Sequence, residues 1–267
     1  MSNYLEQIMA RTLLTVMDRK ANADVPLLER RALAHTPRGF AANLRRVATA
    51  GPAVIAELKR ASPSKGVLRE DYRPSVIARG FQAAGAAAIS VLTDEEFFKG
   101  SLSDLEAVSE AVTIPVLRKD FILDNFQILE ARAAGADAVL LIVAAHTDED
   151  LRSFAREAQE MSLDVLCEVH DRDELERAVN LGFETIGVNC RNLKTLEVMP
   201  AAHEELVRWL PSGVLRVAES GIRNPEDVVR LLDAGYDAFL IGETLMRQPD
   251  PAATLALLIG GDYESET

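Results

Sequence analysis

The chain has 267 residues, of which 48% are hydrophobic and 27% charged, and its formal net charge at pH 7 is −13. This length and apolar content allow one α/β domain with a large core, whereas the acidic excess argues against nucleic acid or an anionic membrane as a partner. No apolar run reaches the ~20 residues of a membrane helix, and residues 1–20 mix acids with bases instead of forming a secretory signal. We therefore expect a soluble, cytoplasmic protein. Two cysteines, Cys167 and Cys190, are too few for a disulfide framework or a zinc site, so we expect buried reduced thiols.

Residues 1–50 are expected to form an N-terminal helical extension. Helical patterns run across Tyr4 to Met17 and Pro26 to Ala34, and Phe40 and Leu44 lie at helical spacing in the segment PRGFAANLRR. The extension could plug the bottom of the fold that follows or close over its top. The sequence leaves both placements open.

Residues 51–255 alternate short apolar runs with longer helical patterns, as βαβ units do. Glycine precedes several runs at equivalent places (Gly85, Gly135, Gly182 and Gly235), where a helix would end in left-handed backbone. We predict a single (β/α)8 TIM-barrel domain, followed by an acidic tail over residues 256–267. The eight predicted strands are Ala53 to Lys59, Ala86 to Thr93, Ile114 to Lys119, Asp137 to Val143, Asp164 to Glu168, Thr185 to Asn189, Val214 to Glu219 and Asp237 to Gly242.

Polar side chains gather at the ends of these strands, where a closed barrel carries its active site. Glu57 and Lys59 alternate in VIAELK, so they would share one face of the first strand. For a single strand-end charge, a salt bridge at the rim is an equally good explanation; a whole set from five strands favours a site. That set is Glu57, Lys59, Lys119, Glu168, Asn189, Arg191 and Glu219.

The loops after the seventh and eighth strands indicate a phosphate site. In phosphate-binding barrels these loops present backbone N–H groups to the anion. Gly221 and Gly242 would let the backbone approach, and Ser220 adds a hydroxyl donor, although both glycines could simply make tight turns. The carboxylate of Glu243 must then point elsewhere. Because the overall charge would repel an anion, local cations have to reverse the field, and these are Lys59, Lys65, Lys119 and Arg191.

Eight segments together resemble the indole-3-glycerol-phosphate synthase family of the tryptophan pathway. They are, in order, ELKRASPSKG, VLTDEEFFKGS, VLRKDFI, DAVLLI, CEVHD, GVNCRNL, AESGI and LIGETLM. The resemblance runs from about residue 40 to about residue 250. Its most specific parts are SPSKG, which contains Ser62, the KDF after the third strand and the N-x-R-x-L after the sixth.

The resemblance implies ring closure, decarboxylation and dehydration of 1-(2-carboxyphenylamino)-1-deoxyribulose 5-phosphate, without metal or cofactor. It assigns Lys119 as the acid at the carbonyl oxygen and Glu168 as the general base, with Lys59 an acid in the dehydration. Burial and the neighbouring Lys59 would lower the pKa of Lys119 towards neutrality. How the two lysines divide the acid steps stays open.

Other residues match binding or orienting groups of the family. Glu57 and Glu219 would orient the lysines, whereas Asn189 and Arg191 would meet the carboxylate and hydroxyls of the substrate. Arg191 could instead form a rim ion pair. The positions that match the wall around the anthranilate ring are Phe98, Phe121, Leu140, Ile142 and Leu193, and for Leu140 and Ile142 a plain core role is equally good.

This sequence differs from the family pattern in two ways, and two alternative functions stay open. Some family members have serine at the position of Glu243, and some place an aromatic of the extension against the substrate, whereas Tyr4 is the only aromatic before Phe40 here. The four histidines form no metal triad, so surface or capping roles are expected for them. The alternatives are another phosphate-barrel enzyme and an inactive barrel that acts as a binding protein. The family also implies a monomer, with weak association with other tryptophan-pathway enzymes left open.

Overall fold

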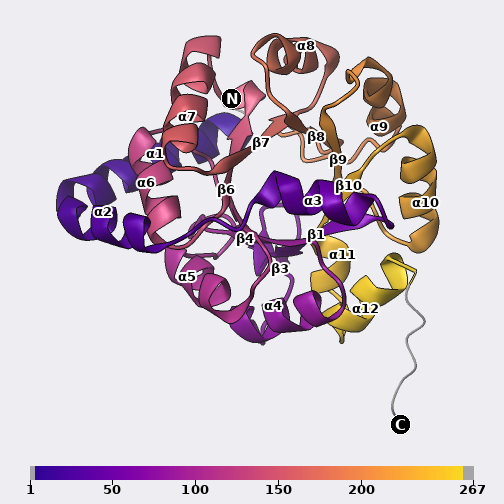
Figure 1. The fold of residues 1–267 in the computed structure, drawn as a ribbon, viewed down its shortest axis with the longest axis horizontal. Helices are drawn as coiled ribbons and strands as arrows, with labels where there is room; N and C mark the ends of the chain where they lie inside the picture. Colours follow the sequence, from indigo (N-terminus) through magenta and orange to yellow (C-terminus); the bar gives the residue numbers. More distant parts are fainter. Residues whose placement is uncertain (1–3, 261–267) are drawn as a thin grey trace.

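The computed structural model describes residues 4–260, and in it the predicted apolar runs form a closed parallel barrel. Neighbouring strands follow the order β1-β10-β9-β8-β7-β6-β5-β4, so consecutive βαβ units lie side by side around the barrel (Figure 1). Each strand coincides with one predicted run, and their ends differ by at most two residues. The strands are β1 Ala53–Leu58, β4 Ala88–Leu92, β5 Val116–Lys119, β6 Ala138–Ile142, β7 Asp164–Val169, β8 Thr185–Asn189, β9 Leu215–Glu219 and β10 Ala238–Ile241. The TIM-barrel prediction is confirmed.

One helix or more follows each barrel strand and covers the outside of the barrel (Figure 1). Side chains at several helix starts accept a bond from the first turn, as Ser101, Thr147 and Asn224 do. The four glycines predicted to follow helices all have positive φ angles, which suit a residue without Cβ. The helices are α4 Pro74–Ala83, α5 Leu102–Ala111, α6 Asn125–Ala133, α7 Asp148–Glu160, α8 Arg172–Asn180, α9 Ala201–Leu206, α10 Pro225–Ala234, α11 Glu243–Met246 and α12 Pro251–Leu258, with short 3₁₀ turns η1 Val143–Ala145 and η2 Val207–Trp209.

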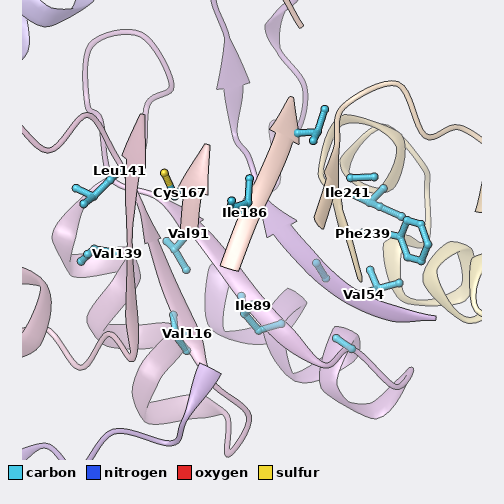
Figure 2. Close-up of a cluster of buried hydrophobic side chains, with 14 of the residues drawn as sticks. Val54, Ile89, Val91, Val116, Val139, Leu141, Cys167, Ile186, Phe239 and Ile241 are labelled. Atoms are coloured by element: carbon cyan, nitrogen blue, oxygen red, sulfur yellow. The ribbon is translucent and has the colours of Figure 1, made fainter. Parts of the chain in front are cut away.

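The strand pleat divides the core into two sets. Outward side chains such as Val54, Val139 and Phe239 pack under the helices (Figure 2). Inward side chains such as Ile55 and Leu117 fill the barrel. Because side chains alternate along a strand, this division also fixes which residues at the carboxyl end point into the barrel.

The N-terminal extension covers both ends of the barrel with different helices. Helix α3 (Phe40–Ala48) closes the bottom, where Phe40 packs into the barrel core and Asn43 donates to the Ala87 carbonyl at 2.6 Å, before β4 begins. Helix α1 (Tyr4–Asn22) places Leu5 and Ile8 at the opposite, carboxyl end. Helix α2 (Val25–Ala34) joins them along α6. The two placements that the sequence left open are therefore both present.

Two details differ from the predicted elements. The loop after β1 contains a two-stranded hairpin, β2 (Ala61–Ser62) with β3 (Gly66–Val67), which no pattern predicted. Helix α12 continues to Leu258, into the predicted acidic tail, of which residues 261–267 lie outside the described part of the chain. Arg118 points outward from β5 yet is fully buried, because Asp120 and Glu130 pair with its guanidinium. Between residues 4 and 260, no helix is both long enough and apolar enough to cross a membrane.

Candidate active site

A cavity of about 910 Å³ lies at the carboxyl end of the barrel. Every residue that the sequence analysis placed in the site lines it, because each either points inward near the carboxyl end of a strand or belongs to the loop that follows. These residues are Glu57, Lys59, Ser62, Phe98, Lys119, Phe121, Leu140, Ile142, Glu168, Asn189, Arg191, Leu193, Glu219, Ser220, Gly221, Gly242 and Glu243. The barrel thus gathers residues that are far apart along the chain.

Lys119 stands between two buried carboxylates at the centre of this cavity. Its Nζ donates to Glu168 Oε2 at 2.8 Å and lies 3.5 Å from Glu219 Oε2. The Lys119 side chain is 12% exposed and both carboxylates are 1% exposed. In so little water these charges interact strongly, and their protonation states depend on one another.

The carboxylates determine the proton affinity of Lys119. Burial alone would lower the pKa of Lys119, but Glu168, Glu219 and Glu57 outweigh burial and raise it. The expectation of a lowered pKa at Lys119 is therefore wrong. The nearby carboxylates, which sequence could not place by distance, decide the direction, and Lys119 holds its proton throughout the neutral range.

The two neighbouring carboxyls have opposite shifts. Burial raises the pKa of Glu168, but Lys119 and His170 lower it well below its usual range. Burial and the negative charge of Glu168 raise the pKa of Glu219 to about 8, although Lys119 acts in the opposite direction. Two titratable groups in contact whose pKa values are pushed apart are typical of acid and base pairs in active sites.

Glu57 and Lys59, which their alternation in the sequence places on one face of the strand, form an ion pair. Glu57 is 2% exposed, and a glycine makes room for its carboxylate: a Cβ on Gly242 would lie 2.3 Å from Glu57 Oε1. A Cβ on Gly187 would likewise lie 2.0 Å from Glu219 Oε1. Glu57 thus requires glycine at position 242. From the sequence, only a phosphate site or a tight turn had been considered as reasons for this glycine.

The loops after β9 and β10 form a polar end of the cavity. Ser220 and Gly221 have φ angles of 66° and 72°, so the chain turns sharply directly after Glu219. The carboxylate of Glu243 faces Arg191, with Oε2 3.2 Å from the guanidinium. Arg191 thus makes the rim ion pair considered from the sequence and lines the cavity as well.

The other end of the cavity is apolar. Phe121, Leu140 and Ile142 are 8%, 2% and 3% exposed, and Phe98 and Leu193 pack against the same inner core. For Leu140 and Ile142, the core role and the lining role coincide, because both face inward near the strand end. A flat apolar group and an anionic group could therefore occupy opposite ends of one cavity, with the charged cluster between them.

Sequence reasoning missed several residues of the cavity. Leu5 and Ile8 join the apolar end from α1, whereas Tyr4 is 44% exposed and does not line the cavity. Asp94 lines the cavity too, and it accepts backbone bonds from Phe97 (2.6 Å) and Phe98 (3.2 Å), which hold the loop that carries Phe98. The helical spacing of Leu5 and Ile8 marks one face of α1, but no pattern in the sequence indicates that this face packs against the barrel.

The expectation of surface or capping roles is wrong for two histidines. His203 is 1% exposed, and its Nε2 lies 3.0 Å from the Glu219 carbonyl oxygen. His170 Nε2 lies 3.1 Å from Glu168 Oε1, directly behind the charged cluster. A signal for His170 was present, because residues 168 and 170 alternate along a strand as Glu57 and Lys59 do.

The thiols are buried, as expected. Cys167 and Cys190 are both free, and Cys167 lies among the outward core side chains of Figure 2. Burial raises the pKa of Cys190 to about 11 and that of Cys167 as well. Both thiols are therefore poor nucleophiles at neutral pH.

Comparison with known structures identifies the architecture. The fold is similar to N-acetylmannosamine-6-phosphate 2-epimerase from Clostridium perfringens, with a TM-score of 0.58 and 15% identity over 73% of this chain and 88% of that one. It is also similar to a mandelate oxidase variant solved with an FMN adduct, with a TM-score of 0.61 and 20% identity over 78% of this chain and 71% of that one. At such identities the likeness shows the barrel fold alone.

Comparison with known sequences is far more specific. A protein from Koribacter versatilis named indole-3-glycerol phosphate synthase is 56% identical over 260 residues, covering 97% of this chain and 100% of that protein. One of the same name from a Nocardioides species is 48% identical, covering 97% of this chain and 98% of its own length. The family model described as indole-3-glycerol phosphate synthase matches residues 5–258. The chain belongs to the indole-3-glycerol phosphate synthase family.

Proposed function

We propose that this protein converts 1-(2-carboxyphenylamino)-1-deoxyribulose 5-phosphate to indole-3-glycerol phosphate, with Lys119 as the acid of ring closure and Glu168 as the base of dehydration. The observation that carries the proposal is the central position of Lys119, between Glu168 at 2.8 Å and Glu219 at 3.5 Å, in a cavity with one apolar and one polar end. Family membership supports the reaction, and the geometry supports the roles.

The substrate would lie along the cavity. Its phenyl ring would contact Phe98, Phe121 and Leu140 at the apolar end, and its phosphate would lie against the loops of Ser220 and Gly242. Backbone N–H groups in such loops bind phosphate well because their dipoles point at the anion. This placement would bring the ribulose carbonyl to the charged cluster between the two ends.

In the first step the ring carbon that bears the carboxylate would attack the ribulose carbonyl carbon. The carbonyl oxygen gains negative charge as the new carbon–carbon bond forms, and Lys119 would give it a proton to make a hydroxyl. Because its pKa is raised, Lys119 is protonated before the reaction begins. A fixed, buried ammonium also stabilises the developing oxyanion without reorganising.

The second and third steps would restore aromaticity. Breakage of the bond to the carboxylate releases carbon dioxide and leaves its electron pair in the ring. Glu168, ionised because its pKa is lowered, would then take the proton from the carbon beside nitrogen while the hydroxyl leaves as water. Lys59 would protonate that hydroxyl, and Glu57 would hold Lys59 through their ion pair.

The proposal also includes finer expectations about substrate contacts and assembly. Asn189 and Arg191 would bind the carboxylate and hydroxyls of the substrate, because both line the cavity beside the charged cluster. We further propose a cytoplasmic monomer, with any association with other tryptophan-pathway enzymes weak.

The direct test is to mix the purified protein with the carboxyphenylamino-deoxyribulose phosphate and follow indole fluorescence. We expect fluorescence to grow with time and one carbon dioxide to be released for each indole formed. An inactive binding barrel would bind the substrate without fluorescence, and that outcome would overturn the proposal.

A further inference from the structure

His170 lies between the carboxylates of Glu174 and Glu168, beside the charged cluster formed by Lys119, Glu168 and Glu219. Its Nδ1 is 3.0 Å from Glu174 Oε2 in the first turn of α8, and its Nε2 is 3.1 Å from Glu168 Oε1 at the end of β7. The backbone N–H of His170 also donates to Glu174 Oε2 at 2.8 Å. The side chain is only 12% exposed.

This arrangement favours a charged imidazole. A carboxylate accepts hydrogen bonds and cannot donate them, so each ring nitrogen needs its own proton to face one favourably. The contact with Glu174 is a hydrogen bond, whereas that with Glu168 is an ion pair in which Nε2 makes no hydrogen bond. Burial lowers the pKa of His170, but Glu168 and Glu174 together raise it to about 10.

His170 does not line the cavity, so it would not touch the substrate. Glu168 separates it from Lys119: Oε1 faces His170 and Oε2 faces Lys119. One carboxylate is thus held at both oxygens by cations from opposite sides, while Glu219 of β9 is the neighbouring acid. When substrate draws Lys119 towards the carbonyl oxygen, the contact with His170 is the one that remains.

We infer that His170 is a positioning residue that keeps the carboxylate of Glu168 oriented and negatively charged for proton abstraction, while Glu174 anchors the imidazole. Its contribution is electrostatic and geometric and acts only through Glu168. The inference rests on the proposed role of Glu168 as the base.

Two variants separate charge from position. His170→Gln keeps an N–H near the Nε2 position but removes the positive charge, whereas His170→Asn keeps a donor only near Nδ1, towards Glu174. Losing a cation this close to a carboxylate raises the carboxylate pKa by about 1–3 units. The acidic limb of the pH profile of kcat/KM therefore moves to higher pH by about 1–3 units in both variants.

The plateau value of kcat distinguishes the two variants further. We expect His170→Asn to lower it by about 10- to 100-fold, because the base is then free to turn away from the reacting proton. His170→Gln is expected to lose less, and KM stays close to the wild-type value in both. His146→Asn is the matched control: His146 follows β6 in the neighbouring loop, packs edge-on against Phe154 and does not line the cavity.

The outcomes separate this inference from the function itself. An acidic limb unchanged in both folded variants, or a lower Tm without any shift of the limb, would mean a structural role and would overturn the inference. Absence of fluorescence with the wild-type protein would instead overturn the proposed function. In that case ¹⁵N NMR of the imidazoles still decides the charge: we expect His170 to carry both ring protons at pH 8, and a neutral His170 would refute the inference.

Discussion

Lys119→Met removes the central ammonium but keeps most of the length and apolar stem of the side chain. If Lys119 is the acid of ring closure, kcat falls by about 10²–10⁴-fold, the usual contribution of a positioned acid. The assay is the initial rate of indole fluorescence at saturating substrate. A folded variant with near-normal kcat would remove Lys119 from the chemistry.

The same change alters the free energy of unfolding. Glu168 loses the partner that lies 2.8 Å away. Removing one member of a buried ion pair costs about 3–5 kcal/mol. The lower end of this range applies for two reasons. Glu219, whose pKa is raised to about 8, is largely uncharged at neutral pH, and His170 still faces Glu168. A loss of about 3 kcal/mol corresponds to a fall in Tm of roughly 6–12 °C for a chain of this size.

The pH dependence of Tm shows whether this loss is electrostatic. In the wild type the pKa of Glu168 is lowered, so its stabilising contribution is present above the unfolded-state pKa and is lost as the pH falls. Without Lys119, only His170 opposes the effect of burial, so the pKa of Glu168 rises from that low value, and the penalty decreases as the carboxylate becomes protonated. We therefore expect the difference in Tm between wild type and variant to shrink between pH 8 and pH 5.

A double variant, Lys119→Met with Glu168→Gln, serves as the control. It removes the carboxylate that has lost Lys119, so Tm at pH 8 recovers while activity does not. A difference in Tm that is equal at pH 5 and pH 8, or that persists in the double variant, would refute the electrostatic argument and indicate lost packing.

Three further changes test other parts of the site. Glu168→Gln keeps the size of the side chain but removes the base, so we expect turnover to fall by about 10²–10⁴-fold. Substrate binding, measured by calorimetry, should survive. Lost binding would mean that Glu168 has a structural role. Gly187→Ala puts a Cβ 2.0 Å from Glu219 Oε1, and we expect kcat to fall more than KM changes. Gly51→Ala is the control and should have no effect, because its Cβ meets nothing within 4 Å. Equal kinetics for the two variants would show that the position of Glu219 is unimportant. Arg118→Met removes the cation that pairs with the buried carboxylate of Asp120, while Glu130 keeps Arg19, so Tm should fall by roughly 6–20 °C, and an unchanged Tm would contradict the importance of the Arg118 ion pairs.

The sequence alone determined the strands and the faces of their residues. Apolar runs such as TIGVN and AVIAEL are short and almost continuously apolar, and glycine precedes several runs of this kind where a helix would end, so the pattern indicated buried strands. The two-residue period then places Glu57 and Lys59 on one face, and the closed barrel brings strand ends together by topology. For that reason the predicted residues line one cavity.

Tertiary structure decided what depends on distance. Lys119 had been expected to have a lowered pKa, and the opposite direction follows from carboxylates 2.8 Å and 3.5 Å away on other strands. The same holds for His170, whose contact with Glu168 was not recognised from the sequence. Interaction energies between charges depend on separation and burial. The order of residues along the chain gives neither quantity directly.

The extension shows the same division. Its helical spacing predicted helices, and Phe40 and Leu44 lie on one buried face of α3. Its placement, with α3 under the barrel and α1 beside the cavity, was open from sequence because an amphipathic pattern states which face is buried and not against what. Only packing against particular strands could decide that, as the contact of Asn43 with Ala87 does at the bottom of the barrel.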